Sequence, residues 1–459
     1  MSRAGGSRCK HPVLQLEPSP FAELAGFERP EARARLAATI KSGRAPPISK
    51  KTKLAEEAET LARAFPAPLV LPHDALNYDP EEPAQSFRSW MNEKARNKVT
   101  EERKTLYVAA PPSIHARLPF MREWMRPNIR PEDPPAKKVK RVDEIEEELI
   151  APGAQDTIEY LRAFYHGLEV KEFDLPLEWV PWEQNKKRVQ NGIPNYVALK
   201  YGDSATRVRA RKAKDGVFPV QLNLDDILDA AIRMLPKDAY SIVLLVHHDI
   251  YENDDDDFCC GRAYGGSRVC VVQSARYSPL LDETEGIAAA AYEHVWPMSH
   301  CKDYVDKLCA VEDVVPKPAS KKEQTLSGAG ALRAAIDAAS DMDMHGSRQE
   351  LEGLWFSRVA RTVSHELGHC LCLAHCVYYA CNMQSTAGMK EDIRQPPYLC
   401  PVCEAKIEHA VAIEQGGSSE YVKGGWTRER NEKLRAFCAG ESRRDVVLWQ
   451  AFGHWLDKS

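Results

Sequence analysis

The chain lacks the features of a membrane-anchored or exported protein. It contains no run of eighteen or more apolar residues, so no membrane-spanning helix is expected. Its first residues, MSRAGGSRCKHPVLQL, lack the apolar core of a secretory signal. The formal net charge is only −5 over 459 residues, which argues against a dominant nucleic-acid-binding face. We therefore expect a cytoplasmic monomer that has neither a membrane nor a nucleic acid as partner.

A disulfide framework is also not expected, although the chain has 13 cysteines. Cytosolic thiols stay reduced, and clustered cysteines there more often bind metal or do chemistry. Six of the 13 fall between Cys370 and Cys403, in the same stretch as three histidines, and the other seven are scattered apart from the pair Cys259–Cys260. This distribution points to metal chemistry in that stretch.

Composition divides the chain into three parts. Residues 1–55 end in the Pro-, Gly- and Lys-rich segment GRAPPISKKTK and are predicted to be poorly ordered. Residues 56–150 form an N-terminal extension that ends in a charged, proline-rich linker, and residues 151–459 form the main domain. Within the linker, PPAKKVKRVD (134–143) resembles a nuclear import signal, which would add a nuclear location. The alternative is a solvated basic loop whose charge the following acidic run offsets.

Alternating helical and strand patterns predict an α/β fold. Short strands are expected at 69–72 and 105–112, and a glycine-punctuated strand pair at 259–277. The continuous apolar run SIVLLVHHDIY at 241–251 suits a buried strand, and the amphipathic spacing of LNLDDILDAAIRMLP predicts a helix just before it. Residues 311–348 are expected to form a loop or flexible lid ahead of a long helix at 349–370.

The predicted long helix ends in the motif H-E-x-x-H. Residues four apart project from the same face of a helix, so His365 and His369 can share one metal ion. Glu366 can then reach a metal-bound water and take its proton. The motif alone also occurs by chance, but His375 follows six residues later, where a chain that leaves the helix and turns back offers a third ligand. Three histidines leave a fourth position open, as in a catalytic zinc site.

Four further cysteines have the spacing of a second zinc site. Cys376 and Cys381 form C-x4-C, and Cys400 and Cys403 form C-x2-C. Two such pairs are typical of a closed, structural four-cysteine site, and the alternative is four ordinary reduced thiols. Met383 would form an apolar floor under the first zinc, although a buried methionine is more often simply core.

Taken together, HELGHCLCLAHC followed by Cys381, Met383, Cys400 and Cys403 resembles the archaemetzincin family of zinc metallopeptidases. Lys406 also fits the C-x-x-C-x-x-K ending of that family, and segments such as FYHGLEVKEF extend the resemblance over most of 155–440. The resemblance implies a zincin-like α/β domain with a twisted, mostly parallel sheet, an active-site helix and a small C-terminal subdomain. The strand near GSRVCVVQ would lie at the sheet edge that faces the cleft.

Carried over residue by residue, the resemblance makes Glu366 the general base of a peptidase. It implies two Zn²⁺ ions, a catalytic one and a structural one, and peptide or protein substrates. Met383 becomes the residue of the Met-turn. The catalytic ligands are then His365, His369 and His375, and the structural ligands are Cys376, Cys381, Cys400 and Cys403.

One position departs from the family pattern. Metzincins have a glycine three residues after the second histidine, where the helix ends at positive φ, and this chain has Cys372. A non-glycine residue there costs about 1 kcal/mol or more, and a displaced turn would displace His375 with it. The thiol is either a buried, strained cysteine or a spare ligand that inhibits by occupying the open position. Because of this departure, a second hypothesis is a zinc-stabilised scaffold protein with little turnover. A third hypothesis, a nucleic-acid-binding finger, is disfavoured by the near-neutral net charge.

Overall fold

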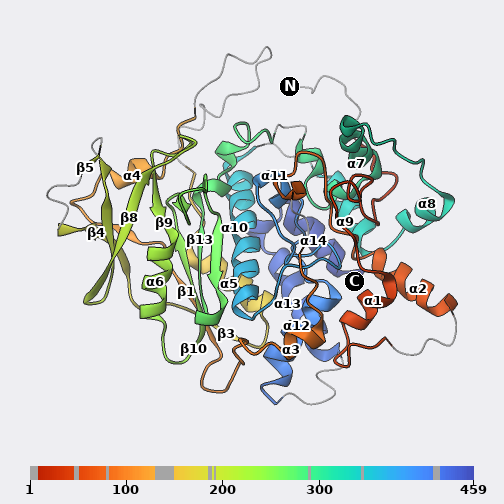
Figure 1. Ribbon diagram of the computed structural model, residues 1–459, viewed down its shortest axis with the longest axis horizontal. Coiled ribbons are helices and arrows are strands. Elements are labelled where there is room, and N and C mark those ends of the chain that lie inside the picture. The colour runs from red at the N-terminus through yellow and green to blue at the C-terminus, as the bar shows by residue number, and fades with distance from the viewer. Residues whose placement is uncertain are drawn as a thin grey trace, which may run out of the picture.

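The computed structural model describes residues 9–45, 51–78, 82–129, 149–183, 189–190, 193–287, 291–342, 346–416 and 424–459. The basic segment 134–143 lies outside these residues. The predicted α/β class is confirmed, because the strands gather in one half of the molecule and most of the helices lie in the other (Figure 1). Among the described residues, no helix combines the length and the apolar character needed to cross a membrane.

A five-stranded, mostly parallel sheet lies next to the long helix. Four of its strands run parallel, and the edge strand β12 is antiparallel to β13. The central strand β10 is buried along its whole length, as its continuous apolar run predicts. In sheet order the strands are β12 (Gly261–Tyr264), β13 (Val269–Gln273), β10 (Ala239–Val246), β1 (Thr105–Ala109) and β3 (Glu169–Glu172).

The edge of this sheet differs from the prediction. The strand within GSRVCVVQ is β13, which is fully buried and has a neighbour on each side. The edge strand is instead β12, the first arm of the same hairpin. The prediction placed the pair correctly and exchanged its two arms.

A second sheet extends the strand half of the molecule. Its strands, in order, are β11 (Ile250–Tyr251), β9 (Val220–Asn223), β8 (Ser204–Lys212), β7 (Tyr196–Tyr201), β4 (Leu177–Pro181) and β2 (Ser113–Ile114). A short hairpin, β5 (Val189–Gln190) and β6 (Ile193–Pro194), lies beside it. Helix α6 (Leu224–Met234) contacts strands of both sheets and shares one apolar cluster with them.

The helix α10 (Arg348–Cys370) confirms the predicted helix at 349–370 and lies between the first sheet and the C-terminal helices (Figure 1). It begins in a capping box, in which the Ser347 hydroxyl accepts from the Glu350 amide and the Glu350 carboxylate accepts from the Ser347 amide. Its second half is buried almost throughout. This burial makes α10 a rigid base for the side chains near its C-terminus.

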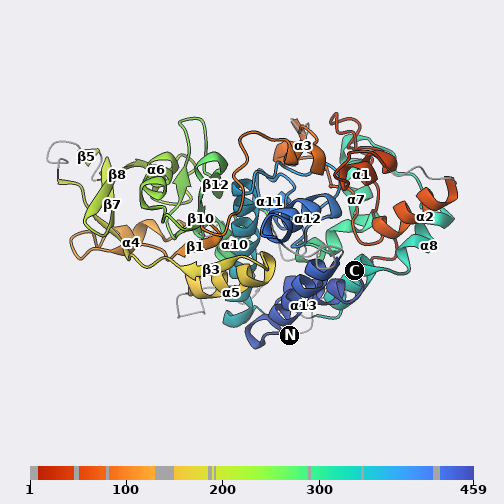
Figure 2. The same cartoon turned by 90° about the horizontal axis from the view of Figure 1, so that it is seen from below.

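The remaining helices pack on the other side of α10 or cover the ends of the sheets (Figure 2). They are α1 (Ala32–Ala38), α2 (Lys51–Ala62), α3 (Phe87–Met91), α4 (Met121–Trp124), α5 (Ala154–Phe164), α7 (Lys302–Cys309), α8 (Lys321–Ser327), α9 (Ala331–Ser340), α11 (Met389–Asp392), α12 (Pro401–Glu408), α13 (Trp426–Cys438) and α14 (Val447–Leu456). The loop expected at 311–348 is therefore wrong, since it contains α8 and α9. Helix α9 buries Leu332 and Ile336 completely and packs against α14.

The described residues 9–45 are packed, whereas the prediction expected residues 1–55 to be poorly ordered. Leu14 and Leu16 are at most 5% exposed and belong to the same apolar cluster as α10. The expected domain boundary at 150 does not separate two bodies, because β1 of the N-terminal extension pairs with β10 and β3 inside the first sheet. The segment 69–72 is not a strand, since prolines at 66, 68 and 72 remove ladder donors, although Leu71 is buried.

A buried ion pair joins the two sheets where their strands end. Asp249, between β10 and β11, is fully buried and makes a two-point ion pair with Arg276, with Nη2–Oδ2 at 2.5 Å and Nε–Oδ1 at 3.0 Å. The side-chain amides of Gln221 in β9 and Gln273 in β13 donate to the same carboxylate. One carboxylate thus receives hydrogen bonds from three side chains, which belong to two separate segments of the chain.

Asp249→Asn is expected to lower the free energy of unfolding by about 3 kcal/mol. Removing one partner of a buried pair leaves an uncompensated charge, and Asp215, which also contacts Arg276, limits the loss. Urea unfolding followed by circular dichroism measures the change. The control Glu123→Gln removes the exposed pair with Arg126 and should stay within about 0.5 kcal/mol of the wild type. Equal losses in the two variants would contradict the role given to Asp249.

Candidate metal centre

The structure brings the three predicted histidines together. His365 and His369 lie one turn apart on α10, and His375 returns from the following loop. One ligand nitrogen from each ring lies within 4.8 Å of the others. The ring centroids are 4.7 to 5.3 Å apart.

Two of these imidazoles have a fixed tautomer. His365 Nδ1 lies 2.7 Å from the carbonyl oxygen of Asn382, and His369 Nδ1 lies 2.7 Å from that of Leu373. A carbonyl oxygen only accepts, so each Nδ1 carries the proton and each Nε2 has a free lone pair. The two Nε2 atoms face each other at 3.0 Å. Two lone pairs at this distance repel unless they share a cation, and nitrogen ligands on a tetrahedral zinc would lie about 3.3 Å apart.

The electrostatics of the site suit metal binding. Burial lowers the pKa of His369 to about 4 and that of His365 well below its usual value, and the neighbouring imidazoles add to both shifts. Both rings are therefore neutral at pH 7, which is the form that binds a metal. Burial also raises the pKa of Glu366 to about 8, against the effect of Arg262. A nearby cation would favour the ionised carboxylate.

The turn that delivers His375 is made in spite of Cys372. Its φ is +63°, the left-handed conformation that glycine adopts most easily. Backbone bonds close the helix end, from the Cys372 amide to the His369 carbonyl and from the Leu373 amide to the Gly368 carbonyl. The Cys372 side chain is only partly buried, lies outside the histidine group and packs against the main apolar cluster. This geometry favours the strained cysteine over the inhibitory ligand.

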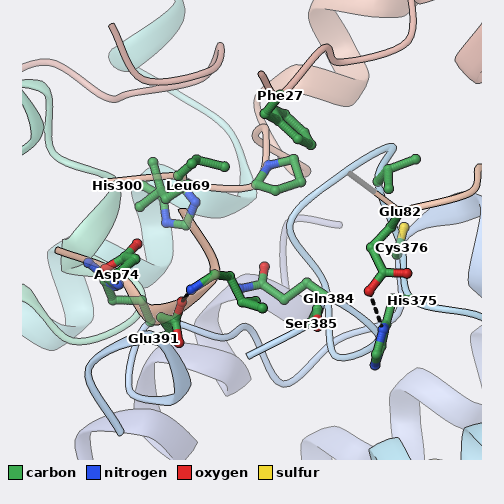
Figure 3. A pocket seen from close by; sticks show the side chains of 15 residues that line it. Phe27, Leu69, Asp74, Glu82, His300, His375, Cys376, Gln384, Ser385 and Glu391 are labelled. Atoms are coloured by element: carbon green, nitrogen blue, oxygen red, sulfur yellow. Dashed lines mark hydrogen bonds and ion pairs between the residues drawn. The ribbon is translucent and has the colours of Figure 1, made fainter. Parts of the chain in front are cut away.

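Glu82, from the N-terminal extension, holds His375 in place. The His375 Nδ1–H donates to Glu82 Oε1 at 2.8 Å (Figure 3). A carboxylate on the outer nitrogen of a histidine fixes its tautomer and orients the other nitrogen toward a metal. The two residues are 293 positions apart, and no local motif around Glu82 predicts the contact.

Gln85 holds the turn itself. Its side-chain amide donates to the Cys372 carbonyl at 2.9 Å, and its side-chain oxygen accepts from the Ala374 amide at 3.0 Å. The Lys406 ammonium in turn donates to the Gln85 backbone and side-chain oxygens at 2.7 and 2.8 Å. The Trp90 indole donates to the Leu371 carbonyl. Lys406, noted in the sequence only as part of a motif, thus anchors the segment that fixes the turn.

The four predicted cysteines also meet. All four are buried, and their sulfur atoms lie within 4.8 Å of one another. Two sulfur ligands at about 2.3 Å from a tetrahedral zinc lie about 3.8 Å apart. The Cys376–Cys400 and Cys381–Cys403 sulfur distances are 3.5 and 3.9 Å, so the cluster has the size of a zinc site.

Met383 lies against α10 at the level of the histidines. It is completely buried, and a Cβ added to Gly368 would come within 2.5 Å of its sulfur. Glycine in the HELGH motif therefore lets the methionine approach the helix. Sequence reasoning missed the adjacent Asn382. Its backbone carbonyl accepts from His365 Nδ1, and its side-chain amide donates to the Arg361 carbonyl.

A cleft runs between the edge strand and the loop that follows Met383. It is lined by Gly261, Arg262 and Ala263 of β12, by Glu366 and the three histidines, and by residues 385–389. A Cβ at Gly261 would lie 3.2 Å from Glu366 Cγ, so glycine lets the strand pass close to the carboxylate. In the described part of the chain β12 pairs only with β13, and its outer edge faces the cleft.

A second cavity meets His375 from the other side (Figure 3). Residues of the N-terminal region, Phe27, Leu69 and Leu76 among them, form an apolar wall. Its far end carries Asp74 and Arg394, which form a buried ion pair at 2.5 Å. The N-terminal region thus contributes directly to the surroundings of the third histidine.

A helix-borne H-E-x-x-H pair with a third histidine, next to an exposed sheet edge, defines the class of fold and site found in zinc metallopeptidases. Within that class, the model of peptidase family M54 matches residues 342–409. Curated relatives include archaemetzincin-2 of Rattus norvegicus, 26% identical over 46% of this chain and 47% of the relative. Archaemetzincin-2 of Homo sapiens is 25% identical over 55% of this chain and 52% of the relative. This chain is therefore similar to the archaemetzincins, and the family model covers the stretch that contains the three histidines and the four cysteines.

The matches are partial in extent. The chain spans about half the length of these two curated relatives, 47% and 52%. The crystal structure of archaemetzincin from Methanopyrus kandleri aligns with 68% of this chain and 97% of that chain, with 14% identity and a TM-score of 0.31. A zinc-dependent peptidase from Methanocorpusculum labreanum aligns with 66% and 99%, with 15% identity and a TM-score of 0.28.

Glu82→Gln is expected to weaken zinc binding at the histidine site by about 10- to 100-fold, because the outer hydrogen bond of His375 loses its charged acceptor. Competition with a chromophoric chelator measures the affinity. Glu28→Gln, which removes an exposed carboxylate from the same region, should leave it unchanged. Unchanged affinity in both variants would show that Glu82 does not support the metal ligand.

Proposed function

We propose that this chain is a zinc-dependent peptidase in which His365, His369 and His375 hold the catalytic zinc. The observation that carries the proposal is the pair of Nε2 lone pairs 3.0 Å apart, with a third imidazole alongside. Three nitrogen ligands leave a position open, which a structural site would fill. Bound zinc supplies a Lewis acid that polarises a carbonyl group and lowers the pKa of water.

Glu366 is the proposed general base. It lies one residue after the first histidine, is 6% exposed and lines the cleft with the three rings. Its ionised carboxylate would take a proton from the attacking water and pass it to the leaving amine. A scaffold protein would have no use for a carboxylate buried at this point, which favours the enzyme over that alternative.

The proposed substrate is an extended segment of a peptide or protein. The free edge of β12 offers backbone donors and acceptors along one wall of the cleft, and a peptide strand can pair with them. The second cavity shares His375 and Ser385 with the cleft. Its apolar wall suits a side chain next to the bond that is cleaved.

The four-cysteine cluster is proposed to hold a second, structural zinc. Cys376 directly follows His375, and its amide donates to the Met383 carbonyl at 2.7 Å. A closed metal site here would therefore fix both the third ligand and the proposed Met-turn. A monomeric, cytoplasmic protein remains our proposal, with nuclear import through 134–143 as the alternative.

Glu366→Gln is expected to lower kcat/KM by about 10³-fold, because general-base catalysis contributes about 10²–10⁴-fold, while zinc content stays that of the wild type. Cleavage of an internally quenched peptide library measures the rate, and elemental analysis measures the zinc. Glu352→Gln, on the first turns of the same helix, is the matched control. Equal cleavage by wild type and Glu366→Gln would remove the base and favour the scaffold.

Zinc content tests the two sites separately. His369→Ala/His375→Ala and Cys400→Ser/Cys403→Ser should each contain one zinc per chain fewer than the wild type, since each pair removes half or more of one ligand set. Inductively coupled plasma mass spectrometry of the desalted proteins provides the count. A double variant that keeps the full wild-type content would eliminate the corresponding site.

A further inference from the structure

A third group of metal-type ligands lies away from both proposed zinc sites. Cys9 and His11 come from the start of the described chain, and His294 comes from a short helical turn, Ala291–His294. One ligand atom from each lies within 4.8 Å of the other two. The sulfur of Cys301, just before α7, is 3.8 Å from the sulfur of Cys9.

The sulfur distance has the value expected for a shared zinc. Two thiolates on a tetrahedral zinc lie about 3.8 Å apart, whereas a disulfide requires about 2.05 Å. The four-cysteine cluster of the same chain has corresponding distances of 3.5 and 3.9 Å. The distance between Cys9 and Cys301 therefore fits two co-ligands and is too long for a disulfide.

Each histidine of this group has one ring nitrogen without a hydrogen-bond partner among the described residues. His11 Nε2 lies 3.2 Å from the Glu293 carbonyl oxygen, so it carries the proton and leaves a lone pair on Nδ1. His11 is only 2% exposed, and within the described residues neither its Nδ1 nor His294 Nε2 has a hydrogen-bond partner. An unpaired buried nitrogen is unfavourable, and a bound cation would give each of these two a partner.

The backbone around the group is also held in place. His11 has a φ of +44°, an unfavourable conformation for a residue with a side chain. The next residues pair with the segment before α7, through bonds from the Gln15 amide to the His300 carbonyl and from the Lys302 amide to the Val13 carbonyl, both 2.9 Å. The ring of His294 stacks on Tyr304 with centroids 4.0 Å apart. Both halves of the ligand set thus belong to packed structure.

We infer that Cys9, His11 and His294, whose ligand atoms lie within 4.8 Å of one another, bind a further Zn²⁺ ion. Cys301, which lies outside that group but whose sulfur is 3.8 Å from that of Cys9, would move in as the fourth ligand. With Cys301, the set would be two thiolates and two imidazoles, a closed tetrahedral set of the structural type, and soft sulfur ligands favour zinc over magnesium or calcium. The ion would fasten the N-terminal segment to the beginning of α7. From there the same segment continues to Phe27, which lines the cavity beside His375.

The test counts zinc in the full chain. Cys9→Ser/His11→Gln should contain one zinc fewer than the wild type, and the control Cys309→Ser/His73→Gln, which changes a cysteine and a histidine outside the group, should match the wild type. Equal zinc in all three proteins would overturn the site. Because the comparison is a difference, its outcome does not depend on the histidine site or on peptidase activity.

A second measurement counts the ions directly. Native mass spectrometry of the reduced wild-type chain, loaded with zinc and then desalted, should show one zinc ion more than Cys9→Ser/His11→Gln treated in the same way, and equal counts would contradict the third site. Peptide mapping of the unreduced protein shows whether Cys9 and Cys301 form a disulfide instead of binding zinc. A Cys9–Cys301 disulfide as the main form would also overturn the proposal, since it would consume both thiolates.

Discussion

Two imidazole lone pairs held 3.0 Å apart are the constraint on which the rest of the site depends. Each is fixed from behind by a backbone carbonyl, so neither ring can relieve the repulsion by changing its tautomer. Helix α10 sets the spacing of the first two rings, and the turn at Cys372 brings the third. The surrounding structure therefore holds a geometry that is unfavourable without a cation and favourable with one, which is the meaning of preorganisation in a metal site.

The parts of this site that could be predicted from sequence are those encoded over short spacings. Helical periodicity places His365 above His369, and paired cysteine spacings predict the four-cysteine cluster. The family pattern also predicts positive φ at Cys372, which the structure confirms at +63°. Here the residue tolerates a conformation that costs about 1–2 kcal/mol because hydrogen bonds on both sides determine the turn.

The N-terminal region could not be predicted, for a physical reason. Its segments are rich in proline and charge, and they form little regular structure of their own. Their order comes from contacts with residues about 290 positions later, such as Glu82 with His375 and Gln85 with Ala374. The local composition of a segment cannot predict contacts with residues so far away in the sequence. The exchanged arms of the β12–β13 hairpin have a different cause, because the continuous apolar run VCVVQ of β13 already favours a buried strand, whereas the mixed sequence GRAY of β12 favours an edge.

These long-range contacts also link metal binding to the packing of the N-terminal region. If Glu82 and Gln85 raise the affinity of the histidine site by some factor, thermodynamic reciprocity requires zinc to stabilise the packed N-terminal region by the same factor. A zinc ion at Cys9, His11, His294 and Cys301 would act on the other end of that region by the same rule. Metal binding would then order the N-terminal region from both of its ends. The third histidine, which is the ligand least constrained by α10, would gain its position from that order.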